Sequence, residues 1–109
     1  MDFDPRTLAQ DLVAHGNLWA DRNSAAEILE ETRKTLRAQI AQKYLTEGMA
    51  TNRAELSAEA SKEYIDHLHA MTEARRLSNR ARVQYDADRA FIDLVRSQES
   101  TKRAEMLIR

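Results

Sequence analysis

A chain of 109 residues is long enough for one domain, and its 42% of hydrophobic and 32% of charged residues make it too apolar for a disordered tail and too polar for a membrane protein. The formal net charge of −1 argues against a protein that binds polyanions over its whole surface. The absence of cysteine excludes a disulfide framework and a thiolate metal site, and two glycines and one proline leave few turns, which favours long helices.

The first predicted element is a helix over about residues 5–47. Asp4 can accept hydrogen bonds from the N–H groups of the first turn, and Pro5 suits the first helical position because it lacks an N–H group. Gly48 is the expected left-handed residue that ends the helix. Since glycine is unfavourable inside a helix, Gly16 is a weak point of this helix; we expect a continuous helix that has room to bend there, with a break at Gly16 as the alternative.

Apolar residues recur in this helix at alternating three- and four-residue steps, which places them in one stripe facing a partner helix. Arg22 and Arg33 interrupt the stripe, and Val13, Ile28 and Tyr44 are expected to widen it. The members of the stripe are Leu8, Leu12, His15, Trp19, Ala26, Leu29, Leu36 and Ile40.

A short helix over about residues 52–60 and a long helix over about residues 62–106 follow. Asn52 and Glu55 have the spacing of a capping box, and Ser61 is expected to cap the long helix. Small residues in the middle of the long helix predict close approach of the two backbones there. Its stripe comprises Tyr64, Leu68, Met71, Ala74, Ser78, Ala81, Tyr85, Ile92 and Val95, with Asp88 as a polar exception.

These elements predict an all-α fold, a long antiparallel helical hairpin with a short connecting helix, as a single domain over residues 1–109. A turn centred near residue 54 aligns Trp19 with the segment Tyr85–Phe91 and sets Asp11 near Arg96. A thin hairpin can only half-bury its apolar stripes, so we expect two copies to assemble into a dimeric helical bundle with coiled-coil packing.

The nearest approach to a metal site lies in the first turns of the long helix. Glu63 and His67 are four residues apart, as are His69 and Glu73, so each pair shares a helix face. Surface charge pairs are the favoured interpretation, and we predict no metal and no cofactor. The chain has no Gly-rich phosphate loop and no nucleophile motif, so we expect no catalytic residues and no enzyme activity.

A basic run formed by Arg75, Arg76, Arg80 and Arg82 is the candidate nucleic-acid site, because guanidinium groups bind phosphate well. The favoured interpretation is nevertheless ion pairing, since acidic residues between positions 27 and 31 should lie at a similar level on the other helix. No aromatic residue interleaves the arginines, which weakens the case for a surface that stacks single-stranded bases.

Residues 96–103 interrupt the apolar rhythm of the last helix, which resumes at residues 106–108. One interpretation is a solvated stretch followed by a dimer contact. The other is a partner-binding surface, in which Gln98, Glu99 and Arg103 supply directional hydrogen bonds around an apolar anchor. Both interpretations place the functional surface at the open end of the hairpin.

Three stretches, Ile28–Leu36, Glu63–Leu68 and Arg96–Ala104, together resemble a group of small helical proteins encoded by tailed bacteriophages and prophages, often beside genes for recombination or DNA replication. The resemblance covers the chain from about residue 25 onward. It implies a phage origin, a bacterial cytoplasm and an accessory role in phage DNA metabolism. It carries no established catalytic residues.

We therefore expect a non-catalytic, homodimeric interaction protein of the phage type, an accessory factor that binds a protein partner in phage DNA recombination or replication. The alternatives are direct nucleic-acid binding through the basic run and inhibition of a host bacterial enzyme. The acidic N-terminus differs from the basic start of a signal peptide, and no apolar run reaches membrane-spanning length. The expected location is the cytoplasm, that of the bacterial host if the chain is phage-encoded.

Overall fold

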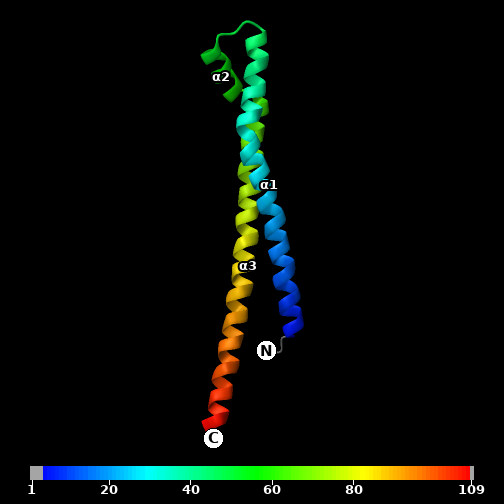
Figure 1. The fold of residues 1–109 in the computed structure, drawn as a ribbon, viewed down its shortest axis with the longest axis vertical. Helices are drawn as coiled ribbons and strands as arrows, with labels where there is room; N and C mark the ends of the chain where they lie inside the picture. Colours follow the sequence, from blue (N-terminus) through cyan, green and yellow to red (C-terminus); the bar gives the residue numbers. More distant parts are fainter. Residues whose placement is uncertain (1–3, 109) are drawn as a thin grey trace.

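The computed structural model describes residues 4–108, and in them two long antiparallel helices are joined by a short one (Figure 1). Helix α1 spans Pro5–Thr46, α2 spans Thr51–Glu59 and α3 spans Lys62–Ile108. The molecule measures 87 × 21 × 17 Å, so the predicted all-α hairpin is confirmed. The domain predicted over residues 1–109 includes residues 1–3 and 109, which lie outside the described residues.

Both ends of α1 follow the predicted capping chemistry. The Asp4 carboxylate accepts a hydrogen bond from the Arg6 backbone N–H at 2.9 Å. At the other end Gly48 has a φ of 94°, its N–H donates to the Leu45 carbonyl at 3.0 Å, and the Met49 N–H donates to the Tyr44 carbonyl at 3.0 Å. This pair of bonds satisfies the last carbonyl groups of the helix and requires the left-handed conformation that glycine adopts without strain.

The connecting helix α2 begins one residue earlier than predicted. The residue before it is Ala50, whose carbonyl accepts the Ala54 N–H at 2.8 Å and whose side chain has no capping group. Asn52 therefore lies inside the first turn, and its predicted capping role is wrong. Ser61 does cap α3, because its Oγ accepts the Tyr64 N–H at 3.2 Å while donating to the Ala58 carbonyl at 2.6 Å.

The main apolar core lies at the closed end of the hairpin, where α2 folds back beside the two long helices (Figure 1). All three helices contribute to it, and two alanines of α2 are fully buried, which lets that helix pack close to its neighbours. The buried members are Ile40, Ala41, Ala54, Ala58 and Tyr64, surrounded by Leu36, Tyr44, Leu45, Met49 and Leu68.

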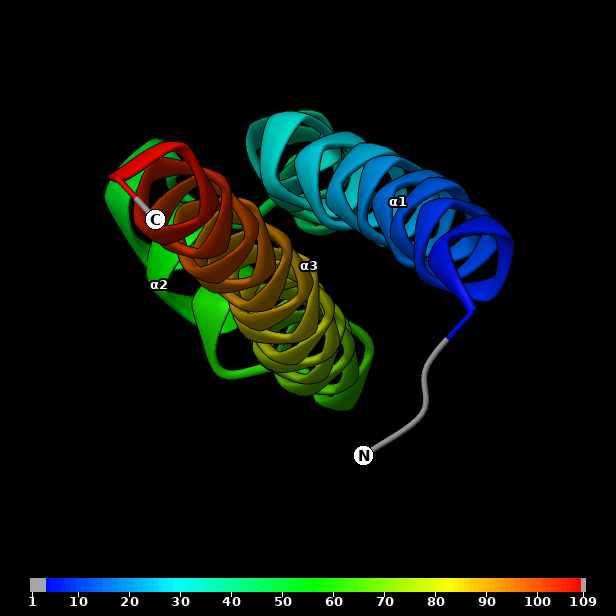
Figure 2. The same cartoon turned by 90° about the horizontal axis from the view of Figure 1, so that it is seen from below.

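Beyond this core the molecule is only two helices thick (Figure 2), and its buried residues become small. Ala26 of α1 and Ser78 of α3 are completely buried, and Ala81 nearly so. Large side chains here would hold the helices apart, so the predicted close approach of the backbones is confirmed at Ser78 and Ala81. The two predicted stripes are at least half-buried along their length.

The predicted widening of the first stripe is only partly correct. Tyr44 packs against the closed-end core, but Val13 and Ile28 are more than half exposed. The physical reason is that a single neighbouring helix covers a narrow strip, and positions beyond the flank of that strip face solvent. No helix in residues 4–108 has a stretch that is both long and apolar enough to cross a membrane.

Candidate functional site

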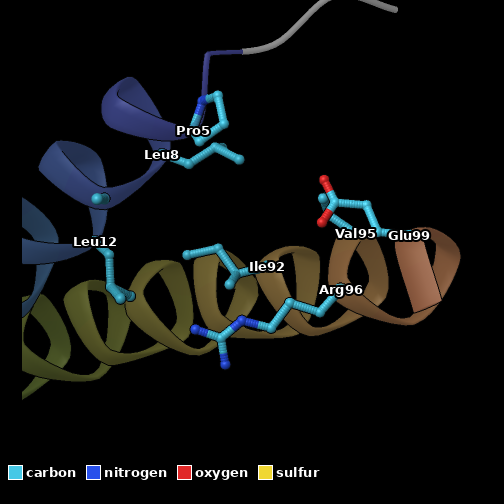
Figure 3. Close-up of a pocket in the computed structure, with 8 residues that line it drawn as sticks. Pro5, Leu8, Leu12, Ile92, Val95, Arg96 and Glu99 are labelled. Carbon is cyan, nitrogen blue, oxygen red and sulfur yellow. The ribbon is translucent and has the colours of Figure 1, made fainter. Parts of the chain in front are cut away.

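A groove lies at the open end of the hairpin, between the start of α1 and the last third of α3 (Figure 3). Its volume is about 340 Å³. Apolar side chains from both helices form the floor, and two charged side chains of α3 stand at the rim. The lining residues are Pro5, Leu8, Ala9, Leu12, Ile92, Val95, Arg96 and Glu99.

Glu99 is the residue of the predicted partner-binding set that lines this groove. Gln98 and Arg103 are exposed on α3 and are not part of the lining. Asp11 and Arg96, which the predicted register sets near each other, form no ion pair within residues 4–108; both side chains are exposed, so solvent competes with such a pair. The structure thus brings together only part of the predicted set.

The end of α3 extends beyond the start of α1 (Figure 1) and has no neighbouring helix within residues 4–108. Every residue from 96 to 108 is exposed, and α3 runs well past the start of α1 in Figure 1. Three apolar residues end this segment with high exposure: Met106 at 74%, Leu107 at 88% and Ile108 at 86%. In soluble proteins such apolar surface beside a groove usually marks an interaction site.

A polar pair lies further along the hairpin on the closed-end side of the groove. His15 of α1 forms a hydrogen bond with the carboxylate of Asp88, and Gln84 donates to the other oxygen of Asp88 at 3.1 Å. Both members of the pair sit in the apolar stripes, where an unpaired charge would be costly. His15 and Asp88 are both recognised as members of the two predicted stripes. Their contact across the hairpin becomes evident only from the register of α1 against α3.

An aromatic pair next to it confirms the predicted register. The rings of Trp19 and Tyr85 are 5.5 Å apart between centroids, and the Arg89 guanidinium lies 5.9 Å from the Tyr85 ring centre. Gly16 leaves room for the tyrosine, because a Cβ atom there would be 3.1 Å from Tyr85 Cε2. Helix α1 is continuous through Gly16, so the alternative of a break is wrong.

The basic run is largely occupied by carboxylates. Arg75 donates from Nε to Glu30 of α1 at 3.1 Å and forms a second bond to the same carboxylate. Arg76 donates to Glu73 at 2.6 and 2.9 Å, and Arg82 lies 4.0 Å from Asp86. The remaining arginine of the run, Arg80, helps lower the pKa of Glu73, after the larger effect of Arg76.

The Glu30–Arg75 pair predicts a stability difference that depends on pH. The hydrogen bond from Arg75 lowers the pKa of Glu30 below its usual 4.5. A carboxylate with a lowered pKa contributes stability that is present above its unfolded value and lost as the pH falls through the folded value. We therefore expect Glu30→Gln to lower the melting temperature at pH 7 and to match the wild type more closely below pH 4.5.

The matched control is Glu31→Gln, which removes the same charge from an exposed neighbour that does not contact Arg75. Melting curves at several pH values, followed by circular dichroism, give the comparison. A Glu30→Gln deficit of equal size at pH 7 and pH 3 would contradict the assignment of this carboxylate as a charged partner.

Two of the residues considered for a metal site are bound to other groups. His67 Nε2 lies 2.8 Å from the Leu29 carbonyl, so that nitrogen carries a hydrogen and donates it to the carbonyl across the hairpin. Glu73, the partner by spacing of His69, is bound to Arg76. Within residues 4–108 no three His, Asp or Glu side chains are grouped so that they could hold a metal ion.

A comparison with protein families, curated proteins and solved structures finds no match to this chain. The arrangement of its own residues is therefore the basis on which a function can be argued. That arrangement consists of an apolar groove, a charged rim and an exposed helical extension, all at the open end.

Proposed function

We propose that this chain is a non-catalytic helical interaction protein that binds a protein partner at the open end of its hairpin. The observation that carries the proposal is the groove between α1 and α3, with an apolar floor at Leu8, Leu12 and Ile92 and a charged rim at Arg96 and Glu99. An apolar centre with polar groups around it is the usual composition of a protein-binding surface.

The groove suits an apolar side chain of another helix better than a small metabolite. It is open along the hairpin, and its floor consists of aliphatic side chains without converging polar groups that would orient a substrate. Helix-in-groove recognition needs a few apolar anchors at helical spacing, and the lining of the groove offers a complementary surface.

The biological setting of the proposal comes from the sequence resemblance. The similarity to small phage and prophage proteins supports an accessory factor in phage DNA recombination or replication, acting in the bacterial cytoplasm. The apolar side chains exposed at the end of α3, among them Met106 and Leu107, support self-association into a homodimer. A host enzyme as the partner, with the chain as its inhibitor, would use the same groove.

Direct nucleic-acid binding is the weaker proposal. Arg75, Arg76 and Arg82 each face a carboxylate, so phosphate would have to displace an existing partner. The basic run is also accompanied by enough acidic residues elsewhere to give the chain a net charge of −1. We therefore propose protein binding ahead of DNA binding for this chain.

The test is capture of partners by the tagged chain from bacterial lysate, with and without nuclease treatment. We expect a variant with Gln98, Glu99 and Arg103 all changed to alanine to bind the partners that survive nuclease treatment at least about tenfold more weakly. This corresponds to a loss of about 1.4 kcal/mol of binding free energy. All three residues are exposed, so the helical content should not fall.

A second triple variant controls for the loss of polar surface. It changes Glu31, Lys34 and Gln39 to alanine, which are exposed residues of similar character on α1 and far from the groove along the chain. Equal capture by both variants would place the partner site elsewhere. Capture that disappears with nuclease would instead favour nucleic-acid binding through the basic run.

A further inference from the structure

The exposed extension of α3 continues the face that lines the groove. Val95 and Glu99 line the groove, and Lys102 and Met106 follow them at steps of three and four residues. Side chains at this spacing share one face of a helix. The groove and the four residues Val95, Glu99, Lys102 and Met106 therefore form one continuous surface, which the hairpin itself leaves uncovered beyond the start of α1.

We propose that a second copy of this chain occupies this surface, with its α3 extension antiparallel to that of the first copy. The centre of the pairing lies between Ser100 and Thr101. In this register the Met106 side chain of each copy enters the mouth of the other copy's groove at the level of Val95, and Glu99 of each copy faces Lys102 of the other. The inference rests on the proposed function, because it names one partner of the same groove.

Charge decides the orientation of the two extensions. Glu99 and Lys102 are the charged members of the shared face. A parallel pairing would set Glu99 against Glu99 and Lys102 against Lys102, and like charges directly opposite each other are unfavourable. An antiparallel pairing sets each glutamate against a lysine, twice per dimer, because a twofold axis relates the two copies.

Apolar contacts decide the position of the pairing along the helix. Met106 is 74% exposed and is flexible enough to fit an irregular groove of about 340 Å³. Moving the pairing by one heptad would set Lys102 against Met106 in one direction, or Glu99 against Val95 in the other, a charged side chain against an apolar one.

One pair of charges opposes the arrangement. Arg96 of one copy and Arg103 of the other lie on the same flank of the paired helices. Glu99 stands four residues before Arg103 on the same helix and partly neutralises it, while Gln98 and the other copy's Glu105 can form a hydrogen bond on the opposite flank. We therefore expect a moderate affinity that changes with salt concentration.

The register is tested by cross-linking single-cysteine variants, which the cysteine-free sequence makes possible. Val95→Cys and Met106→Cys are each treated with a short bismaleimide, alone and after mixing. The mixture should form the Val95–Met106 hetero-dimer, identified by intact mass. Val95→Cys alone should give little product, because two copies of position 95 would be about 16 Å apart at 1.5 Å per residue.

The control mixes Ser97→Cys with Ala104→Cys, positions that are level in the proposed register but lie on the outer face of the helix. This mixture should react much less. Efficient cross-linking of Val95→Cys with itself would show a parallel pairing and overturn the inference. Equal yields from the Val95–Met106 mixture and the control would also overturn it.

The charge pairing is tested by reversal. Glu99→Lys alone and Lys102→Glu alone should each weaken dimerisation about tenfold or more, because two attractive pairs become repulsive. The double variant Glu99→Lys/Lys102→Glu should recover wild-type dimerisation, and so should a mixture of the two single variants. Sedimentation equilibrium measures all four samples, with circular dichroism to verify that the helices are retained.

The outcomes separate this inference from the proposed function. If the wild-type chain stays monomeric, or if the double variant does not recover, the second copy is not the occupant and the inference fails. The proposed function then still stands when the Gln98/Glu99/Arg103 variant loses nuclease-resistant partners. If that variant keeps its partners while the cross-links form as expected, the proposed function fails for outside partners and the groove serves self-association alone.

Discussion

Replacing Ile40 with alanine is expected to lower the free energy of unfolding by about 2–5 kcal/mol, which is a large share of the stability of a small domain. Ile40 is 5% exposed and belongs to the closed-end core, where all three helices meet. The loss combines the transfer of buried methyl groups with the cavity that remains, since α2 and α3 cannot fully collapse around the smaller side chain. Urea unfolding at micromolar concentration provides the measurement.

Ile28→Ala is the matched control, because it makes the same change in the same helix at a position that is 60% exposed. We expect a loss below about 1 kcal/mol, typical of a surface substitution. Comparable losses at the two positions would mean that the closed-end core does not dominate the stability of the hairpin.

Enlarging Ala26 to leucine is expected to destabilise the hairpin by about 1–3 kcal/mol, because a side chain with no room forces shifts in its surroundings. Ala26 is 0% exposed in the thin middle of the molecule, where Ser78 and Ala81 of α3 are also buried. The added atoms must separate α1 from α3 at this point. Thermal unfolding should show a fall of about 4–8 °C for each kcal/mol lost.

The neighbouring Ala25 provides the control, since its side chain is exposed and Ala25→Leu adds the same atoms to solvent. Alanine and leucine have nearly the same helix propensity, so the free energy of unfolding of Ala25→Leu should stay within about 0.5 kcal/mol of the wild-type value. A stable Ala26→Leu variant would contradict close packing of the two backbones in the middle of the hairpin.

The fold was largely predictable because its determinants are local. The three- and four-residue spacing of apolar side chains defines both stripes, and Gly48 and Ser61 carry capping chemistry that acts within a few residues. The register followed from the turn position, which brought Trp19 beside Tyr85. With so few turn residues in the chain, few other arrangements of the helices were available.

The errors arose where several local solutions have similar energies. Asn52 had the right spacing for a cap, but α2 starts at Thr51 and needs no side-chain cap. The Asp11 and Arg96 side chains are exposed, so solvent competes with an ion pair between them. Val13 and Ile28 have apolar side chains at flanking positions, and composition alone does not show how far a neighbouring helix reaches.

The candidate site could be predicted only in part. Sequence patterning marked residues 96–108 as unusual and selected Glu99. It did not identify Pro5, Leu8 and Leu12 as the opposite wall, because the groove exists only where the packing of α1 on α3 loosens. Such a loosening depends on the sizes of all the side chains between the helices and has no signature in a single stretch of sequence.

The unaccompanied end of α3 has a consequence for the energetics of assembly. Residues 97–108 are helical but exposed, so their order depends mainly on propagation from the preceding turns. Propagation beyond a packed region is nearly neutral in free energy for ordinary residues in water, and such turns exchange their amide hydrogens readily. A molecule that covers this segment must therefore supply the free energy of ordering it. Helix content and association become linked equilibria, and the length of α3 varies with the concentration of whatever binds it.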